Sequence, residues 1–209
     1  SVSELERWRD DCLVAVLQGL RGVATGAGET VARWEQGLLD AAGGDGAELS
    51  EAPLRLLDQE IPPGWVDYNH HVHESRYLQL FADATDALLR LIGVDAAYVA
   101  GTGSFYTVET HLCHLAPAFA GDRVSVETHV LGFDGRRLHL FHRLLRNGES
   151  EPLATAEQMM LHVAGGHVAA AGGAVGERAA EVALLHAGLP TPSRAGRSIR
   201  PAGGGSRSG

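Results

Sequence analysis

Residues 65–93 read WVDYNHHVHESRYLQLFADATDALLRLIG, and this stretch decides the fold. Its second half spaces apolar side chains by three and four residues, which predicts one amphipathic helix ending at Gly93. This is the longest apolar helical face in the chain; its members are Tyr77, Leu78, Phe81, Leu88, Leu89 and Ile92. Such a face has to be buried against another layer of structure.

Strand-like segments lie on both sides of this helix. Leu54 to Ile61 precedes it, and four segments rich in β-branched or alternating apolar residues follow it. These four are Ser104 to Leu115, Val124 to Val130, Arg137 to Leu144 and Pro152 to Val163. The pairs at 121–122, 134–135 and 147–148 each join Gly to Asp or Asn, as expected of tight turns. The order predicts an α+β fold, an antiparallel sheet wrapped around one long helix.

The rest of the chain is predicted as flanking segments. Residues 1–40 show helical periodicity, 41–52 are rich in Gly and acids and predict a linker, and the main domain spans 53–165. Residues 166–209 predict a helix from about Glu177 to His186, then a disordered tail from Leu189. The Gly26-Ala-Gly28 stretch is a poor dinucleotide fingerprint, because no strand precedes it, and is predicted as a turn.

Composition narrows the function classes. The net charge of −9 argues against nucleic-acid binding, and no apolar run reaches the roughly 20 residues that cross a bilayer. Ser1 to Asp11 is charged and resembles no signal peptide, so a cytoplasmic location is expected. Cys12 and Cys113 predict no disulfide framework. All 17 basic residues are arginines, so lysine-based catalysis is excluded and a ligand's phosphates need Arg or backbone N–H groups.

The chemistry-bearing part of the sequence is the run from Trp65 to Tyr77. It sets an acid, an amide, three imidazoles and a second acid just before the long helix. The N-terminus of a helix offers free N–H groups and partial positive charge. The run therefore predicts an oxyanion site beside a general base.

This run resembles a known signature. Asp-x-Asn-x-His-Val-His-x-x-x-Tyr is similar to the Asp-x-x-Gly-His-(Val/Met)-Asn-x-x-x-Tyr signature of hotdog-fold thioesterases, and the resemblance covers about the middle half of the chain. Pieces such as Glu-Ser-Arg-Tyr-Leu and Tyr-Thr-Val-Glu-Thr-His resemble the betainyl-CoA thioesterase branch, often fused behind a carnitine 3-dehydrogenase. Residues 6–13 resemble the C-terminal end of such a dehydrogenase. The Rossmann part that binds NAD is absent, and the resemblance implies no cofactor and no metal. Two residues depart from the signature, His70 at its Gly and His73 at its Asn.

The resemblance and the loop chemistry together imply a reaction, hydrolysis of betainyl-CoA to betaine and CoA. Asp67 acts as general base for water, or as nucleophile through a mixed anhydride, and Asn69 and His71 orient the loop or the water. The thioester carbonyl lies near His73, Glu74 and Ser75. The predicted catalytic residues are Asp67, Asn69, His71 and Glu74. The predicted substrate-binding residues are Trp65, Tyr68, His73, Ser75, Tyr77, Tyr106 and Glu109, with aromatic faces suited to a trimethylammonium group.

Plainer interpretations of the same residues stay open. Asp67 suits a turn or cap, His71-x-His73 with Asp67 has metal-ligand types, and Glu109 suits a surface charge. Arg76 suits either a solvated helix start or a phosphate contact. Histidines on the strand patterns are expected to be structural or surface residues; they are His111, His114, His129, His139 and His142.

The predicted partner is an acyl-CoA substrate in a homodimer, or a homotetramer, because hotdog domains pair their sheets and place sites at the seam. Arg136, Arg137 and Arg143 are the candidates for holding CoA phosphates. The competing functions are a non-catalytic acyl-CoA-binding domain, a hotdog dehydratase or hydratase, and a general short-chain thioesterase.

Overall fold

The computed structural model describes residues 49–196 and Ile199, and here six strands form one antiparallel sheet. The order is β1-β3-β4-β5-β2, with β6 paired to β5. The strands are β1 (Leu54–Glu60), β2 (Ser104–His114), β3 (Arg123–Phe133), β4 (Arg137–Arg146), β5 (Pro152–Ala164) and β6 (His167–Val168). The helices are η2 (Pro63–Trp65), α3 (Glu74–Leu91), α4 (Ala96–Gly101) and α5 (Gly173–His186). The predicted strand, long helix and four-strand order is confirmed.

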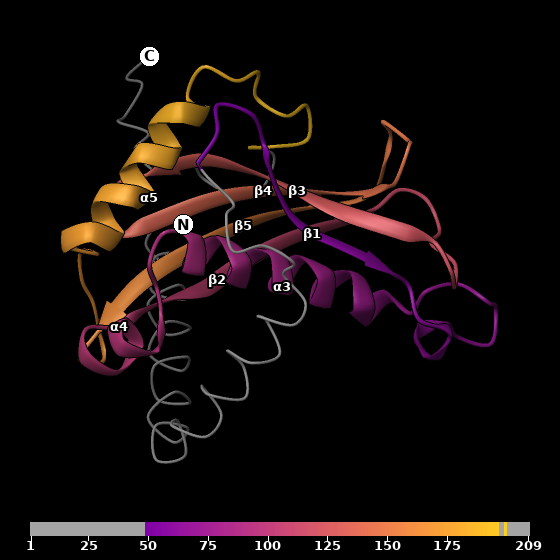
Figure 1. The fold of residues 1–209 in the computed structure, drawn as a ribbon, viewed down its shortest axis with the longest axis horizontal. Coiled ribbons are helices and arrows are strands. Elements are labelled where there is room, and N and C mark those ends of the chain that lie inside the picture. Colours follow the sequence, from indigo (N-terminus) through magenta and orange to yellow (C-terminus); the bar gives the residue numbers. More distant parts are fainter. Residues whose placement is uncertain (1–48, 197–198, 200–209) are drawn as a thin grey trace, which may run out of the picture.

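The sheet curves over α3, which runs along its inner face, below the strands in Figure 1. Most of the predicted apolar face is buried by α3: Phe81 and Leu88 have no exposed surface, and neither has Leu80, which was not predicted. Burying a side chain of this size contributes about 1.5–3 kcal/mol. One member of the predicted face is wrong: Leu78 is 45% exposed, because it lies on the side of α3 that turns away from the sheet.

α5 lies on the opposite face of the sheet. Alternate side chains of a strand point to opposite faces. Thr128 of β3 faces α3, where its hydroxyl contacts the buried His142, and the next residue, His129, contacts His186 of α5. His186 also accepts the Val130 N–H, which fixes α5 on β3. α5 therefore covers the outer face of the sheet at β3.

A polar cluster lies inside the core between α3 and the sheet. His142 is fully buried and stacks on Phe81 of α3. Its Nε2 lies 3.2 Å from Gln158 Oε1, a carbonyl that only accepts, so Nε2 carries the proton and Nδ1 accepts from the Thr128 hydroxyl at 2.9 Å. Thr85 of α3 contacts both His142 and Gln158. These bonds satisfy a group that would otherwise be costly to bury.

The C-terminal segment corrects one prediction. Residues 189–196 and Ile199 were expected to be disordered, yet Ile199 is 2% exposed and Gly196 donates its N–H to Glu157 Oε1 at 2.9 Å. Glu157 lies buried on the sheet beside His139. A buried carboxylate needs hydrogen-bond donors, and the Gly196 N–H supplies one. This part of the C-terminal segment therefore packs on the sheet. The expected helices in residues 1–40, residues 41–48 of the expected linker, and the end of the tail lie outside the described residues. No described helix is long and apolar enough to cross a membrane.

Candidate active site

The loop between β1 and α3 is a tight turn organised by Asp67. Its N–H donates to the His71 carbonyl at 2.8 Å, and its Oδ1 accepts the N–H groups of Asn69 and His71 at 2.8 and 3.3 Å. Val66 and Val72 close the turn with a β-bridge, and Val72 is buried. Oδ1 of Asp67 is therefore the turn acceptor that the plainer interpretation predicts. Oδ2 takes no part in these turn bonds, so the same side chain can also act on a ligand.

His70 adopts the left-handed backbone conformation, with φ of 62°. Gly enters this region freely, and a residue with a Cβ enters it at a cost. The position that the thioesterase signature gives to Gly is thus one that requires positive φ here. His70 is exposed at the tip of the loop, so its side chain does not narrow the pocket described below.

His73 caps α3 with its own side chain. Its Nδ1 accepts the Ser75 N–H at 3.3 Å and lies 2.9 Å from the Ser75 hydroxyl. The signature's Asn is also a strong capping residue, so this departure preserves the cap. One consequence corrects the predicted oxyanion site: the Ser75 N–H is already bonded, and the Arg76 N–H donates to the His73 carbonyl. Of these first N–H groups, that of Glu74 has no partner among the described residues.

The loop and the start of α3 line a pocket of about 720 Å³. Its predicted members are Asp67, Tyr68, His73, Glu74 and Tyr77, with buried Val72 between them. The opposite wall is the end of β2 and the following loop: His114, Leu115, Ala116 and Pro117. His114 was expected to be structural or a surface residue. Its place in the pocket, 4.8 Å from the Tyr77 ring, follows from strand pairing, which local sequence does not display.

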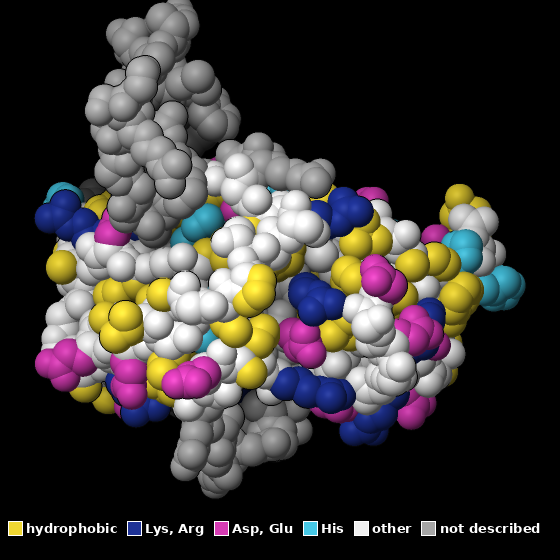
Figure 2. All heavy atoms as spheres, turned by 90° about the horizontal axis from the view of Figure 1, so that it is seen from above, with side chains coloured by type: hydrophobic (Ala, Val, Ile, Leu, Met, Phe, Trp, Pro, Cys, Tyr) yellow, Lys and Arg dark blue, Asp and Glu magenta, His cyan; other side chains and the backbone are white. Residues whose placement is uncertain are grey.

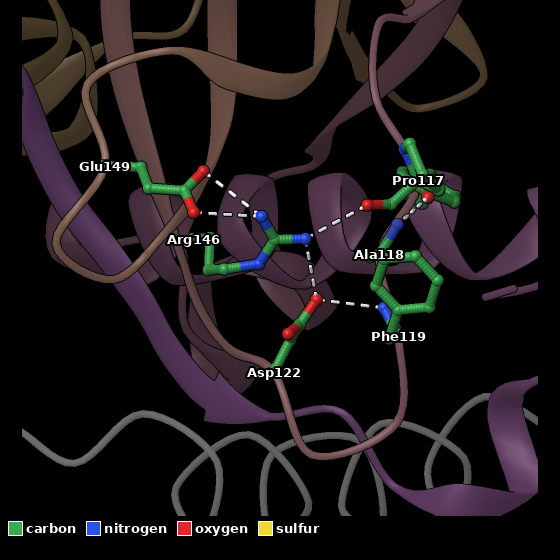
Figure 3. A network of polar contacts seen from close by, with 7 residues as sticks. Pro117, Ala118, Phe119, Asp122, Arg146 and Glu149 are labelled. Atoms are coloured by element: carbon green, nitrogen blue, oxygen red, sulfur yellow. Dashed lines mark hydrogen bonds and ion pairs between the residues drawn. The ribbon is translucent and has the colours of Figure 1, made fainter.

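The second wall is held by a network that Figure 3 shows. Arg146 of β4 donates to the Pro117 carbonyl at 3.1 Å and to Asp122 Oδ2 at 3.0 Å, and its other nitrogen binds Glu149. The same Asp122 oxygen accepts the Phe119 N–H at 2.9 Å. Asp122 and Glu149 raise the pKa of Arg146, so its guanidinium stays charged and keeps these contacts.

The loop of residues 117–122, which Arg146 holds, in turn contacts the other side of the pocket, formed by the Asp67 loop and the start of α3. Ala118 donates its N–H to the Tyr77 hydroxyl and accepts the Val72 N–H, each at 2.9 Å. Burial raises the pKa of Tyr77, so its hydroxyl stays protonated. Arg146, far from Asp67 in sequence, therefore helps to position the Asp67 loop, and no sequence pattern pointed to it.

Several predicted site residues lie outside the pocket. Asn69 and His71 are exposed, and the His71 ring lies edge-on to Phe119 at 5.4 Å. The Arg76 guanidinium covers a face of Trp65 at 5.2 Å, and neither lines the pocket. Tyr106 and Glu109 lie on β2 eight and five residues before His114, roughly 26 and 16 Å away at strand spacing.

The candidate phosphate-binding arginines are mostly engaged within the chain. Arg137 pairs with Asp134 at 2.6 Å, and Arg143 binds Glu127 and the Ser150 carbonyl. Arg136 is exposed. On the face in Figure 2, arginine and acidic side chains alternate over the described residues and form no continuous basic surface. Among those residues no three His, Cys, Asp or Glu side chains are grouped to hold a metal ion.

Comparisons with known proteins agree with this architecture. The chain belongs to the thioesterase-like superfamily, whose family model matches residues 61–181. A betainyl-CoA thioesterase of Pseudomonas aeruginosa is 41% identical over 149 residues, which are 70% of this chain and 94% of that protein. An L-carnitine dehydrogenase/betainyl-CoA thioesterase of Rhizobium meliloti is 42% identical over 95% of this chain. The chain spans about two fifths of the length of such two-part relatives, 42% in this case. The resemblance inferred from the sequence is confirmed.

Solved structures support the fold. A candidate thioesterase from Pseudomonas putida superimposes with a TM-score of 0.62 at 37% identity, over 72% of this chain and 98% of that one. A Staphylococcus aureus protein solved in complex with CoA has a TM-score of 0.63 at 22% identity, over 69% and 93% of the two chains. The predicted hotdog architecture is thereby confirmed.

Proposed function

We propose that this chain hydrolyses acyl-CoA thioesters, with betainyl-CoA as substrate and betaine and CoA as products. The observation that carries the proposal is the pocket at the N-terminus of α3, which is lined by Asp67 and by Glu74, whose N–H has no acceptor among the described residues. A carboxylate and an oxyanion donor on one pocket are the two parts that thioester hydrolysis needs. The relatives named for this activity support the choice of reaction and substrate.

Asp67 either removes a proton from water as it attacks the thioester, or attacks directly and forms a mixed anhydride. Its Oδ1 is fixed by two backbone N–H groups, so the turn presents Oδ2 in a defined direction. The thioester carbonyl lies against the first turn of α3, where the helix dipole favours negative charge. Glu74 lies at the same end and remains a proposed catalytic group, whereas Asn69 and His71 act only through the loop.

Product analysis tests the reaction type. Incubation of the chain with betainyl-CoA, followed by mass spectrometry and thiol detection, should yield free CoA and betaine. Betainyl-CoA has no double bond to hydrate, so the hydratase alternative is tested with a short 2-enoyl-CoA, where a product of the starting mass plus water with the thioester intact would identify a hydratase. Bound but unchanged betainyl-CoA would identify a binding domain.

Substrate preference follows from the charge and rings of the pocket. Asp67, Glu74 and the 89%-exposed Tyr68 line it, which suits a cationic acyl group. Trp65 was expected to join this set, but Arg76 already covers its ring. We therefore assign the aromatic contact to Tyr68.

We expect betainyl-CoA to have a higher kcat/KM than 3,3-dimethylbutyryl-CoA, its neutral isostere. A cation–π contact of about 0.5–2 kcal/mol corresponds to roughly 2- to 30-fold, and Tyr68→Ala should narrow the gap by that factor. Tyr68→Phe keeps a ring and should preserve it. Equal or faster hydrolysis of the isostere would make the protein a general short-chain thioesterase.

We further propose that the chain acts as a homodimer, or a dimer of such dimers, paired through β2. This strand is a sheet edge whose residues 107–110 are exposed, and Val108 is 38% exposed. An unpaired edge is a template for pairing with a second chain. Antiparallel pairing of two β2 strands would also bring Tyr106 and Glu109 of one copy toward the pocket of the other.

Val108→Glu tests this assembly, because it puts a charge at the edge without disturbing a buried site. We expect the wild type to be dimeric or larger by light scattering at micromolar concentration, and Val108→Glu to be monomeric and at least tenfold less active. Leu184→Glu is the matched control, since Leu184 is 77% exposed on α5, which packs on β3, three strands away from β2. An active wild-type monomer would refute the proposal.

The cytoplasmic location and the absence of nucleic-acid and membrane partners remain predictions from the sequence.

A further inference from the structure

The contacts of His73 at the start of α3 select one tautomer of its neutral ring. Its Nδ1 accepts the Ser75 backbone N–H, and a backbone N–H can only donate. Nδ1 therefore holds a lone pair and no proton in this state. A neutral imidazole carries its single proton on the other nitrogen, so His73 is an Nε2–H tautomer.

The backbone alone gives the pocket few donors at this end. The cap uses the Ser75 N–H, the Arg76 N–H donates to the His73 carbonyl, and the His73 N–H donates to Trp65. Only the Glu74 N–H is left among these four. An oxyanion is usually met by more than one donor, and His73 and Glu74 both line the pocket that holds Asp67.

We propose that the His73 Nε2–H is a second donor to the thioester oxygen, which makes His73 a catalytic residue for the function proposed above, on which this inference rests. Water adds to the carbonyl carbon as Asp67 takes its proton, and negative charge gathers on the carbonyl oxygen. The two donors stabilise that charge. When the electron pair on that oxygen re-forms the C=O bond, the carbon–sulfur bond breaks. The proton then passes from Asp67 to the leaving CoA thiolate.

Two variants separate this role from helix capping. Asn, Ser and Asp cap helices about equally well, so His73→Asn and His73→Ser both retain an acceptor for the Ser75 N–H. The Asn side chain also retains an N–H donor on a second atom, whereas the single Ser hydroxyl oxygen lies one bond from Cβ and is too short to place its O–H where Nε2 lies. Thermal unfolding of both variants should therefore match, and steady-state kinetics with betainyl-CoA report the donor alone.

We expect His73→Ser to lose about 10²–10³-fold in kcat with little change in KM, the cost of removing one oxyanion donor, and His73→Asn to lose at most about tenfold. Equal kcat values for the two variants at matched stability would overturn the inference and leave the hydrolase function standing. A wild type that releases no thiol from any acyl-CoA would overturn the function and the inference together.

Discussion

Asp67→Asn should lower kcat for betainyl-CoA by 100-fold or more while the protein stays folded. The substitution removes the charge that accepts a proton or attacks the thioester, and positioned general bases contribute about 10²–10⁴-fold. The Asn side chain keeps an oxygen for the N–H groups of Asn69 and His71, so the turn should persist. Steady-state thiol release and a thermal melt of the same preparation measure the two effects.

Asp67→Ala is the companion variant. It removes both the charge and the turn acceptor, so its kcat should be at least as low as that of Asp67→Asn, and its melting temperature lower. Near-wild-type turnover in Asp67→Asn would remove Asp67 from the chemistry. Glu74 would then be the carboxylate to test, since it lines the pocket and Glu109, on β2, does not.

Acidification should destabilise the protein between pH 6.5 and 4, chiefly through His142. Burial lowers the pKa of His142 from 6.5 to about 4, and its neighbours Thr85, Thr128 and Gln158 carry no charge to offset this. A depressed histidine pKa means that the unfolded chain binds a proton at higher pH than the folded one. Stability is therefore complete above pH 6.5 and falls as the pH drops toward 4.

The size of the effect can be measured against His142→Gln. We expect the wild type to lose about 2–3 kcal/mol of unfolding free energy through this residue between pH 7.5 and 4.5, by denaturant titration. His142→Gln should be less stable at pH 7.5 but lose less on acidification. Burial also lowers the pKa of His129, His139, His162 and His186, so both proteins share a background of the same sign. Parallel pH profiles would contradict the assignment.

Periodicity and turn chemistry were sufficient to predict the elements of the fold. Residues 77–92 repeat with helical spacing and the strands alternate, and both patterns follow from which face is buried. Gly at residues 121, 135 and 148 supplies the positive φ that the turns require. Leu78 was wrongly assigned to the buried face of the helix, because helical spacing alone does not show which edge of an apolar stripe faces solvent.

The candidate site was only partly predictable. Asp67, His73 and Glu74 could be found because they adjoin a helix start in one short loop. His114 and Arg146 reach the site through strand pairing and loop packing, which depend on residues distant in sequence. His73 accepts the Ser75 N–H, and the Arg76 guanidinium covers one face of Trp65. Both contacts depend on side-chain rotamers, which sequence spacing does not show.

Thiol release from betainyl-CoA by the purified wild-type chain, measured beside calorimetric binding of the same compound, decides whether this protein hydrolyses the thioester or only binds it. Free CoA and betaine should form in equal amounts, at a rate proportional to protein concentration. Betainyl-CoA that binds to the chain and stays intact would contradict the proposed function.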